Sequence, residues 1–445
     1  RGPPGARARR DAAGAVLMDT TTISVSEVVF REDLYPRIEH DPRLVQKYSE
    51  DLEVLPPIEV NQHHELIDGW HRWTAYRKIG AETIPVIITQ TKSDVEFLSL
   101  AIERNAKHGQ QLTNTDKRKM AIRLFNSGAG VSDKTYLAKI LSVSQKTIDR
   151  YLKETEDRIK VDRDAKIFGM YLSGHTQQEI ADAVGISQPS VVERSKTLSD
   201  LDKCPKPIKI AALFEDDFKA PLYNVWRFTK SSNNVAHFGE SEQTIVENLL
   251  YLYTAPFDLV VDPFAGGGST IDICKKRLRR VWASDRKPIP ERENDIRKHD
   301  IVTDGIPPLN NRWSDVSLTY LDPPYWKQAE GQYSNDAEDL ANQSIEDFTR
   351  NLSNLVIEVG KRQSKGVIAL LIQPTQWRSP DRKFTDHVFD VIRAVQDSGV
   401  NLELVNRVSC PYNSEQYNPQ MVNVAKDEKL LLVLTRELIV WRCGV

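Results

Sequence analysis

The carboxy-terminal half of the chain alternates short apolar runs with longer mixed stretches. Most of these runs end at a glycine, a proline or an acidic residue, which is typical of buried strands in an α/β fold. The runs that predict strands are Val260 to Asp262, Val281 to Asp285, Val316 to Leu321 and Gly366 to Gln373. A closing hairpin is predicted from two later runs, Leu402 to Arg407 and Leu430 to Thr435. We therefore predict an α/β domain, with ligands beyond the carboxyl ends of its strands.

The amino-terminal part shows two other patterns. Residues 19–110 mix short strands with one helix: Pro56 to Val60 pairs with His64 to Ile67, Trp70 to Gly80 predicts a helix ended by glycine, and Ile84 to Ile88 predicts a strand. Residues 111–200 have a helical pattern throughout. These patterns predict a small α+β domain, an all-α region and a third domain at 201–445, reached through a linker at Ser199 to Pro207.

Composition narrows the class of protein. The first 18 residues are rich in Arg, Ala, Gly and Pro, and we expect them to be disordered, or to be sequence that precedes the natural start at Met18. No run of about 18 apolar residues occurs, so no membrane span is expected. The four cysteines form no C-x-x-C pair, which argues against zinc or another bound metal and fits a reducing cytosol. The net charge of −3 argues neither for nor against binding to nucleic acid.

Two motifs stand directly after predicted strands. The first is the stretch Asp262-Pro-Phe-Ala-Gly-Gly-Gly-Ser-Thr270, and the second is Asp322-Pro-Pro-Tyr325. Glycines let a ligand approach the backbone closely, and the start of a helix offers free N–H groups. Two such strand ends in one sheet predict a single site.

This pair of motifs resembles the S-adenosylmethionine-dependent amino-methyltransferases of DNA, which have a Rossmann-like fold. The resemblance implies a catalytic role for Asp322, Pro323, Pro324 and Tyr325: the carboxylate and the Pro323 carbonyl accept hydrogen bonds from the exocyclic amine of a flipped base, and Tyr325 stacks on that base. It implies cofactor contacts from Asp262, Pro263, Phe264, Ala265, Gly266, Gly268, Ser269, Thr270, Asp285 and Asp300. Asp285 would bond the ribose hydroxyls, and Asp300 would face the adenine amine or be an ordinary loop acid.

The resemblance favours transfer to N6 of adenine, because related cytosine-N4 enzymes more often carry serine in place of Asp322. Cytosine N4 stays an alternative, since either amine fits the same hydrogen bonds. Similar motifs also occur in methyltransferases of ribosomal RNA and of protein. A further alternative is a ParB-like DNA-binding regulator whose methyltransferase domain is vestigial.

The first domain resembles the amino-terminal domain of ParB-like proteins. The matching segments are Leu55-Pro-Pro-Ile-Glu-Val60, Ile67-Asp-Gly-Trp-His-Arg72 with the helix after it, and Ile84-Pro-Val86. The resemblance implies a nucleotide site at Gly69, His71, Arg72 and Asn105, because a helix start beside basic side chains favours an anion. The second box of the family is only loosely present, with His108 where an arginine is common. Whether a nucleotide binds here is therefore left open.

Two segments of the helical region repeat one pattern at an offset of 43 residues. Each has a small residue, Ala138 or Ala181, then a turn, and then a serine suited to cap the next helix, Ser144 or Ser187. The pattern resembles the DNA-reading helix-turn-helix; the alternative is a helical hairpin that only packs. The residues expected to contact DNA are Gln145, Lys146, Thr147 and Arg150 in the first copy and Gln188, Ser190 and Arg194 in the second.

The spacing of the motifs affects how DNA would be chosen. Only 60 residues separate Asp262 from Asp322, which leaves no room for a separate target-recognition domain between the motifs. We therefore expect the ParB-like domain and the helix-turn-helix region to supply DNA targeting. The expected partner is double-stranded DNA and not a membrane, the expected location is the cytoplasm at the nucleoid, and a homodimer is left open.

Overall fold

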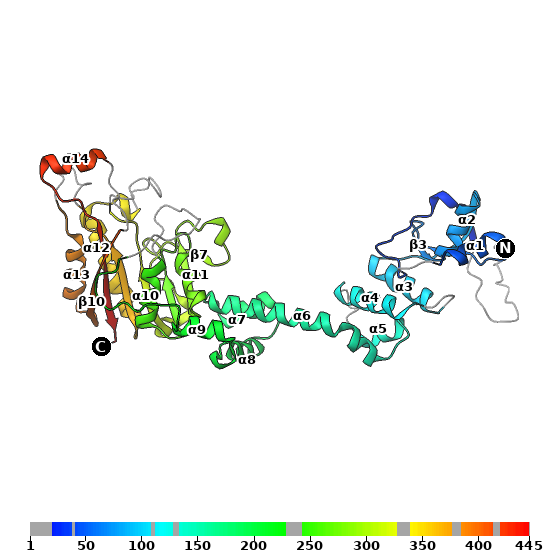
Figure 1. Cartoon of the computed structure of the whole chain (residues 1–445), viewed down its shortest axis with the longest axis horizontal. Helices are drawn as coiled ribbons and strands as arrows, with labels where there is room; N and C mark the ends of the chain where they lie inside the picture. The colour runs from blue at the N-terminus through cyan, green and yellow to red at the C-terminus, as the bar shows by residue number, and fades with distance from the viewer. Residues whose placement is uncertain are drawn as a thin grey trace, which may run out of the picture. The chain divides into compact units, whose positions relative to one another are not determined.

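The computed structural model describes residues 20–37, 41–107, 112–127, 133–227, 243–326, 339–375, 384–412 and 419–444. The chain divides into two compact units, Arg1–Val161 and Asp162–Val445 (Figure 1). The division falls inside one helix, α6 (Gln145–Leu172). The helical region 111–200, predicted as one domain, is thus shared between the units. The segment 1–18 lies outside the described residues.

The first unit begins with a small mixed sheet. Its strands follow the order β1 (Thr20–Ser24), β4 (Thr83–Ile88), β2 (Ile58–Val60) and β3 (Leu66–Asp68). Strand β4 runs antiparallel to β1 and parallel to β2, and β2 pairs antiparallel with β3. Helix α2 (Trp70–Lys78) buries Trp73 and Tyr76 in one core with apolar residues of the strands, and α1 (Pro42–Glu50) packs beside α2. The strands and the helix predicted between Pro56 and Ile88 are therefore present.

Helices complete the first unit. Helix α3 (Asp94–Lys107), α4 (Asn114–Asn126), α5 (Lys134–Ile140) and the first part of α6 share a second core. Helix α4 starts with a reciprocal cap, in which Thr113 and Asp116 each bond the other's backbone N–H. Leu124, Leu137 and Leu152 are fully buried where these helices meet. This core makes α5 and the start of α6 one packed helix pair.

The second unit is built on a sheet that has seven strands among the described residues. Its order is β10 (Leu402–Pro411), β11 (Thr435–Cys443), β9 (Val367–Ile372), β8 (Val316–Leu321), β5 (Leu259–Asp262), β6 (Arg280–Asp285) and β7 (Ile296–Lys298). From β9 to β7 the strands are parallel, whereas β11 and β10 are antiparallel to their neighbours. The predicted α/β class is therefore correct for this part of the chain.

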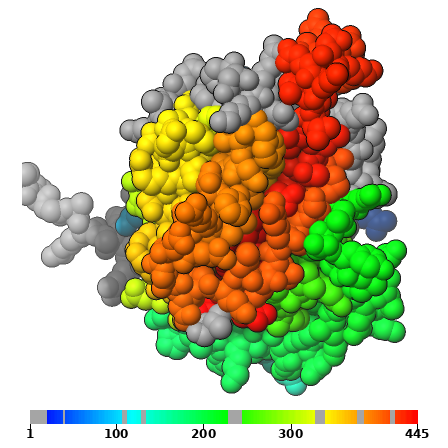
Figure 2. All heavy atoms as spheres, turned by 90° about the vertical axis from the view of Figure 1, so that its left-hand side faces the viewer, coloured from blue at the N-terminus to red at the C-terminus, as the bar shows by residue number. Residues whose placement is uncertain are grey.

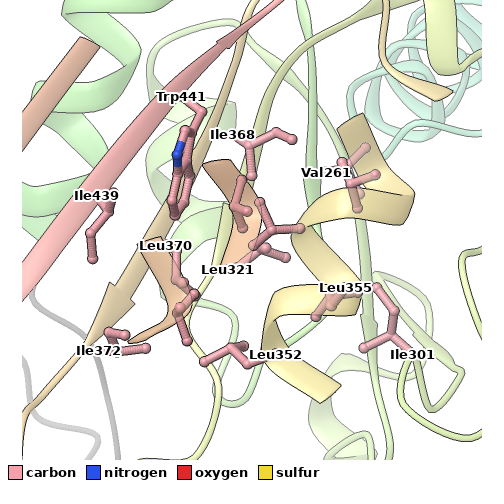
Figure 3. Packing of buried hydrophobic residues seen from close by; sticks show 14 of the residues in the cluster. Val261, Ile301, Leu321, Leu352, Leu355, Ile368, Leu370, Ile372, Ile439 and Trp441 are labelled. Carbon is pink, nitrogen blue, oxygen red and sulfur yellow. The ribbon is translucent and has the colours of Figure 1, made fainter. Parts of the chain in front are cut away.

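Helices cover both faces of this sheet. Alternate residues of one strand enter opposite cores: Ile368, Leu370 and Ile372 of β9 face one, whereas Val367, Ala369 and Leu371 face the other. The first core includes residues of α12 (Ile345–Arg362) and α13 (His387–Asp397), and Figure 3 shows Leu352 and Leu355 near Leu321 and Ile368. The second includes α10 (Gln243–Tyr253) and α11 (Ser269–Lys276). Figure 2 views the side covered by α12 and α13, in yellow and orange. Such two-sided cover explains why these strands are continuous apolar runs.

The end of α6 belongs to the second unit, together with α7 (Gln177–Val184) and α8 (Gln188–Leu198). Ile167, Ile180 and Val191 form a small core between the three helices. The turn after α6 lies against the sheet: Ser173 Oγ donates to Asp295 Oδ1 at 2.8 Å, and Arg312 donates to the Gly174 carbonyl at 2.7 Å. The second helix pair is therefore fixed to the α/β part of the chain.

Three elements differ from the sequence-based expectation. The final arm of the hairpin is Thr435–Cys443 and not Leu430 to Thr435, because Thr435–Cys443 pairs with β9 and β10 and buries its apolar side chains on both faces of the sheet. The long connection before it contains a helix, α14 (Pro419–Glu428). The predicted linker contains a 3₁₀ turn at Leu201–Lys203 and the start of α9 (Lys206–Leu213). None of the helices in the described ranges is long and apolar enough to cross a membrane.

Candidate active site

The glycine-rich loop joins β5 to α11. Gly266 and Gly268 have φ values of +49° and +84°, which only glycine adopts readily. The turn is closed by hydrogen bonds from the Phe264 N–H to Asp262 Oδ1 at 3.0 Å and from the Gly268 N–H to the Ala265 carbonyl at 2.7 Å. A Cβ on Gly266 would meet nothing closer than 4.0 Å, so open space lies beside the loop. A ligand can therefore approach this backbone closely, and the loop fits the predicted cofactor site.

Asp262 stands at the base of this loop and is 1% exposed. Burial raises its pKa to about 7, although a hydrogen bond with the Thr270 side chain and the one from the Phe264 N–H oppose the shift. The carboxylates of Asp322 and Asp285 raise it further. The charges of Asp322 and Asp285 thus both act on Asp262, as expected of neighbouring strand ends. Pro263, Ser269 and Thr270 are buried in the loop and the first turn of α11.

Asp285 ends β6 and holds the loop in place. Its carboxylate accepts the Gly266 N–H at 2.9 Å and the Lys287 N–H at 2.8 Å. Asp300 follows β7 and organises a different turn, because it accepts the Val302 N–H at 3.0 Å and lies 3.3 Å from Arg286 Nε. Both acids lie at the carboxyl ends of their strands, and both carboxylates are bonded within the chain.

The second motif follows β8, the strand next to β5. Tyr325 Oη donates to Asp322 Oδ1 at 3.1 Å, and Tyr320 Oη donates to Asp322 Oδ2 at 3.3 Å. Burial raises the pKa of Asp322 to about 6, while the charge of Arg436 and the two tyrosine hydroxyls oppose that shift. Pro323 is buried and Pro324 partly buried. The two tyrosine hydroxyls thus favour the charged form of Asp322, which is the stronger hydrogen-bond acceptor.

Four residues near this motif were not among the predicted site residues. Arg436, at the start of β11, lies with its guanidinium 4.4 Å from the centre of the Tyr412 ring, and the Tyr412 hydroxyl donates to Gln373 Oε1 at 2.9 Å. Tyr320 lies inside β8, and its sequence position marks it only as a strand residue. Residues 413–418, which follow Tyr412, lie outside the described residues.

Three residues of the predicted nucleotide site, Gly69, His71 and Arg72, lie at the start of α2, and Asn105 lies on α3; the side chains of His71, Arg72 and Asn105 are engaged within the chain itself. Gly69 precedes α2 with a φ of +107°. Arg72 donates to the Pro57 carbonyl at 2.7 Å and pairs with Asp68 at 2.7 Å. The His71 ring accepts the Asp41 N–H, and burial followed by the charge of Arg37 lowers its pKa. Asn105, on α3, is buried and donates to the Ala101 carbonyl at 2.8 Å. His108 lies outside the described residues.

The two helix pairs share one turn geometry. The Val143 N–H donates to the Ala138 carbonyl at 3.0 Å, and the Ile186 N–H donates to the Ala181 carbonyl at 3.2 Å. Ser142 and Gly185 both have positive φ. After the turn, Ser144 and Ser187 accept the Thr147 and Ser190 N–H groups.

The side chains predicted to contact DNA divide into two groups. Gln145, Lys146, Arg150, Gln188 and Ser190 are exposed, and Thr147 is partly exposed with its hydroxyl bonded to Ser144. Arg194 instead pairs with Asp164 on α6, where its Nε donates at 2.9 Å. The first set is therefore available for a partner, whereas Arg194 helps to hold α8 on α6. No metal-binding group of three or more His, Cys, Asp or Glu side chains is found within the described ranges.

Two known families match different parts of the chain. Residues 36–106 match the family model described as ParB N-terminal domain, and residues 114–288 match that of DNA methylase. The chain carries a ParB N-terminal domain and a DNA methylase region. The DNA methylase match includes the glycine-rich loop and ends before Asp322. It also includes both helix pairs.

Individual relatives cover smaller parts. The transcriptional regulator NovG of Streptomyces niveus is 30% identical over 105 residues, which are 23% of this chain and 32% of that protein. The chain thus matches about a third of the length of that curated relative. The chromosome-partitioning protein ParB of Caulobacter crescentus, solved with the centromeric parS site, is 13% identical with a TM-score of 0.24, and covers 40% of this chain and 99% of that one. A Pnob8-like ParB-N domain is 11% identical with a TM-score of 0.27, and covers 44% and 88%. TM-scores this low establish no shared overall arrangement.

Proposed function

We propose that this protein is a DNA methyltransferase that transfers a methyl group from S-adenosylmethionine to the N6 amine of a flipped adenine. The observation that carries this proposal is the placement of Asp322, with its two tyrosine donors, on the strand next to the one that ends at Asp262 and the glycine-rich loop. A cofactor loop and an amine acceptor therefore share one edge of a sheet, and the DNA methylase match includes the loop.

Several residues are proposed to bind S-adenosylmethionine. Gly266 and Gly268 give close access to the loop backbone, and Asp285 stands at the end of β6, where a carboxylate can accept ribose hydroxyls. Asp300 would face the adenine amine with the acceptor positions that its bond to the Val302 N–H and its pairing with Arg286 leave free. When bound, S-adenosylmethionine supplies an electrophilic methyl carbon attached to a positively charged sulfur.

In the proposed reaction, Asp322 binds and orients the target amine. Its carboxylate accepts an N–H of the target amine and holds the nitrogen toward the methyl carbon. The methylated nitrogen would carry an extra proton, which the Asp322 carboxylate or water would take up. Because the amine is paired inside a duplex, the base must leave the stack. Tyr325 is then the ring on which it would stack.

DNA targeting is proposed to come from the ParB N-terminal domain and the two helix pairs. Lys146 and Arg150 are exposed beside the capped start of α6, where they can contact phosphate. Replacing both by alanine should weaken DNA binding about tenfold at low salt and should reduce its dependence on salt. Arg194→Ala is the contrast, because that guanidinium pairs with Asp164 and its loss should affect stability first. Equal DNA affinity of the double variant and the wild type would remove the first helix pair from the proposal.

The nucleotide site remains a separate proposal. A nucleotide phosphate at the start of α2 would have to replace Asp68 and the Pro57 carbonyl as partners of Arg72. The ParB protein of Caulobacter crescentus has also been solved in complex with CTP-gamma-S, so CTP is the probe to use. Binding of CTP that is lost in Arg72→Ala would support the site.

A second candidate function is a DNA-binding regulator with an inactive methyltransferase domain. The match to a transcriptional regulator favours it, whereas the intact loop and the Asp322 cluster favour an enzyme. The deciding experiment measures S-adenosylmethionine binding and methyl transfer to DNA with the wild type and Asp322→Ala. We expect both proteins to bind the cofactor and only the wild type to transfer the methyl group. A wild type that binds no cofactor would favour the regulator, and an active Asp322→Ala would overturn the catalytic assignment.

A further inference from the structure

The first turn of α11 is joined directly to the last glycine of the glycine-rich loop. The Gly268 carbonyl accepts the Ile271 N–H at 3.0 Å and the Asp272 N–H at 3.2 Å, while the Gly268 N–H donates to the Ala265 carbonyl at 2.7 Å. The backbone of Asp272 and the closure of the loop therefore share one residue. A side chain that holds Asp272 in place also holds this end of the loop.

Arg292 holds Asp272 from the connection that follows β6. It ends a 3₁₀ turn, Pro290–Arg292, and its two terminal nitrogens donate separately to the two carboxylate oxygens of Asp272 at 2.8 and 2.6 Å. Such a forked pair fixes the orientation of the two groups as well as their distance. The guanidinium also lies against the loop, because a Cβ built on Gly268 would be 3.4 Å from Arg292 Nε.

A second ion pair stands beside the first. Lys275 comes three residues after Asp272, on the same face of α11, and its Nζ donates to Asp295 Oδ1 at 2.7 Å. The other oxygen of Asp295 lies 3.8 Å from a terminal nitrogen of Arg292. The four side chains are 22–45% exposed, so the pairs are only partly screened by water. An acid and a base on α11 thus face a base and an acid on the connection after β6.

The same connection holds the other end of the loop. Asp285, where β6 ends, accepts the Gly266 N–H at 2.9 Å. Gly266 and Gly268, the two loop residues with positive φ, are therefore each held by one end of this connection, by Asp285 and by Arg292. A loop that is fixed at both ends loses less conformational freedom when a ligand binds, and this favours binding.

We propose that Arg292 is a positioning residue for S-adenosylmethionine, which holds the glycine-rich loop in its binding conformation through the carboxylate of Asp272. The inference rests on the proposed function, in which this loop binds the cofactor. Arg292 acts through Asp272 and Gly268 and not on the reacting atoms. The connection after β6 thereby becomes a clamp on the cofactor loop, with Asp285 at one end and Arg292 at the other.

The test is titration calorimetry of S-adenosylmethionine with the full chain. Arg292→Met removes the guanidinium and keeps an apolar stem, Asp272→Asn removes the charge of its partner and keeps the shape of the side chain, and the double variant completes the cycle. The matched control is Lys276→Met, which removes an ion pair of 3.1 Å between α11 and Glu247 of α10. Thermal midpoints without cofactor identify any variant that does not fold.

Arg292→Met should bind S-adenosylmethionine about fivefold more weakly, as for the loss of one partly buried ion pair. Asp272→Asn should show the same loss, and the double variant should be no weaker than either single one, because all three lack the same pair. Lys276→Met should bind as the wild type does. The single-turnover rate at saturating cofactor should be unchanged in all four.

Three results would overturn the inference: wild-type affinity in the folded single variants, losses that add in the double variant, or an equal loss in Lys276→Met. Asp272→Asn decides the question if Arg292→Met does not fold. A wild type that binds no cofactor would instead contradict the proposed function.

Discussion

The hydroxyl of Tyr325 lies 3.1 Å from Oδ1 of Asp322, on the same carboxylate that is expected to accept the target amine. The tyrosine of the motif therefore has two separable parts, a ring that can stack on a base and a hydroxyl that stabilises the ionised acid. Both parts lie beside β8, which brings them to the edge of the glycine-rich loop.

The two parts of Tyr325 can be tested separately. Tyr325→Phe keeps the ring and should lower the methyl-transfer rate about tenfold, because a hydrogen bond to a charged group contributes about 1.5 kcal/mol. Tyr325→Ala also removes the stacking surface and should lower the rate at least a further tenfold. Cofactor affinity should not change in either. Single-turnover rates decide the matter, and a phenylalanine variant as slow as the alanine variant would show that the ring contributes little.

Asp285 should control cofactor affinity without affecting the acid that accepts the amine. Asp285→Ala removes the acceptor of the Gly266 and Lys287 N–H groups, so the loop loses its tie to β6. We expect S-adenosylmethionine to bind about 10–100-fold more weakly, as for the loss of one or two buried hydrogen bonds. Titration calorimetry measures this. Glu291→Ala, an exposed acid in the connection after β6, is the control, and equal losses in the two variants would refute a specific role for Asp285.

Gly174 should be essential for attaching α6 to the sheet. It has a φ of +69°, and a Cβ there would lie 2.8 Å from the Val281 carbonyl oxygen of β6. Gly185 has nearly the same backbone, with a φ of +71°, but its Cβ would meet no atom within 4 Å. Gly185→Ala should therefore cost about 1 kcal/mol of unfolding free energy from backbone strain alone. Gly174→Ala should cost about 2 kcal/mol more, because backbone must shift. Urea unfolding that gives the same loss for both would disprove the close contact.

Some of this arrangement was predictable from the sequence. Asp262, Asp285 and Asp322 each follow an apolar run, so local pattern alone placed them at strand ends, and parallel strands bring their carboxyl ends to one edge. The two helix pairs were visible because their turn chemistry repeats at a fixed offset. Each strand end and each helix pair is marked by residues within about 20 positions of chain, which is the range over which periodicity and caps are informative.

The rest depends on contacts between distant segments. Arg436 lies over the Tyr412 ring only because β11 pairs with β10, and nothing around it in the sequence distinguishes it from a surface arginine at a strand end. The run Leu430 to Leu434 resembled a strand, but the register of β11 with β9 and β10 favours Thr435–Cys443. The contact of Gly174 with Val281 likewise exists only once α6 lies on the sheet. That contact is why the second helix pair belongs to the α/β unit.

The buried histidine at the start of α13 predicts a pH dependence of stability. His387 is 0% exposed beside Trp326 and Phe348, and burial lowers its pKa to about 4. An unfolded histidine titrates near 6.5, so the unfolded state binds more protons between pH 6.5 and 4. The stability from the neutral ring is complete above pH 6.5 and is lost as the pH falls toward 4, by up to about 3 kcal/mol.

The comparison variant for this effect is His387→Leu, which fits an apolar site and does not titrate. Unfolding free energies of wild type and variant are measured from pH 7 to 4.5. The difference between them should shift in favour of the variant as the pH falls. Asp262 and Asp322, whose pKa values are raised, contribute with the opposite sign in both proteins and cancel in that difference. A difference that does not change with pH would show that His387 is not held neutral.

The central claim is that the loop after β5 and Asp322 after β8 form one site for methylating DNA. Its most direct test is methyl transfer from labelled S-adenosylmethionine to mixed-sequence double-stranded DNA, followed by digestion to nucleosides. We predict label in N6-methyladenine; label in N4-methylcytosine would keep the mechanism and correct the base. Bound cofactor with no label in DNA, with Asp322→Ala and wild type behaving alike, would contradict the claim.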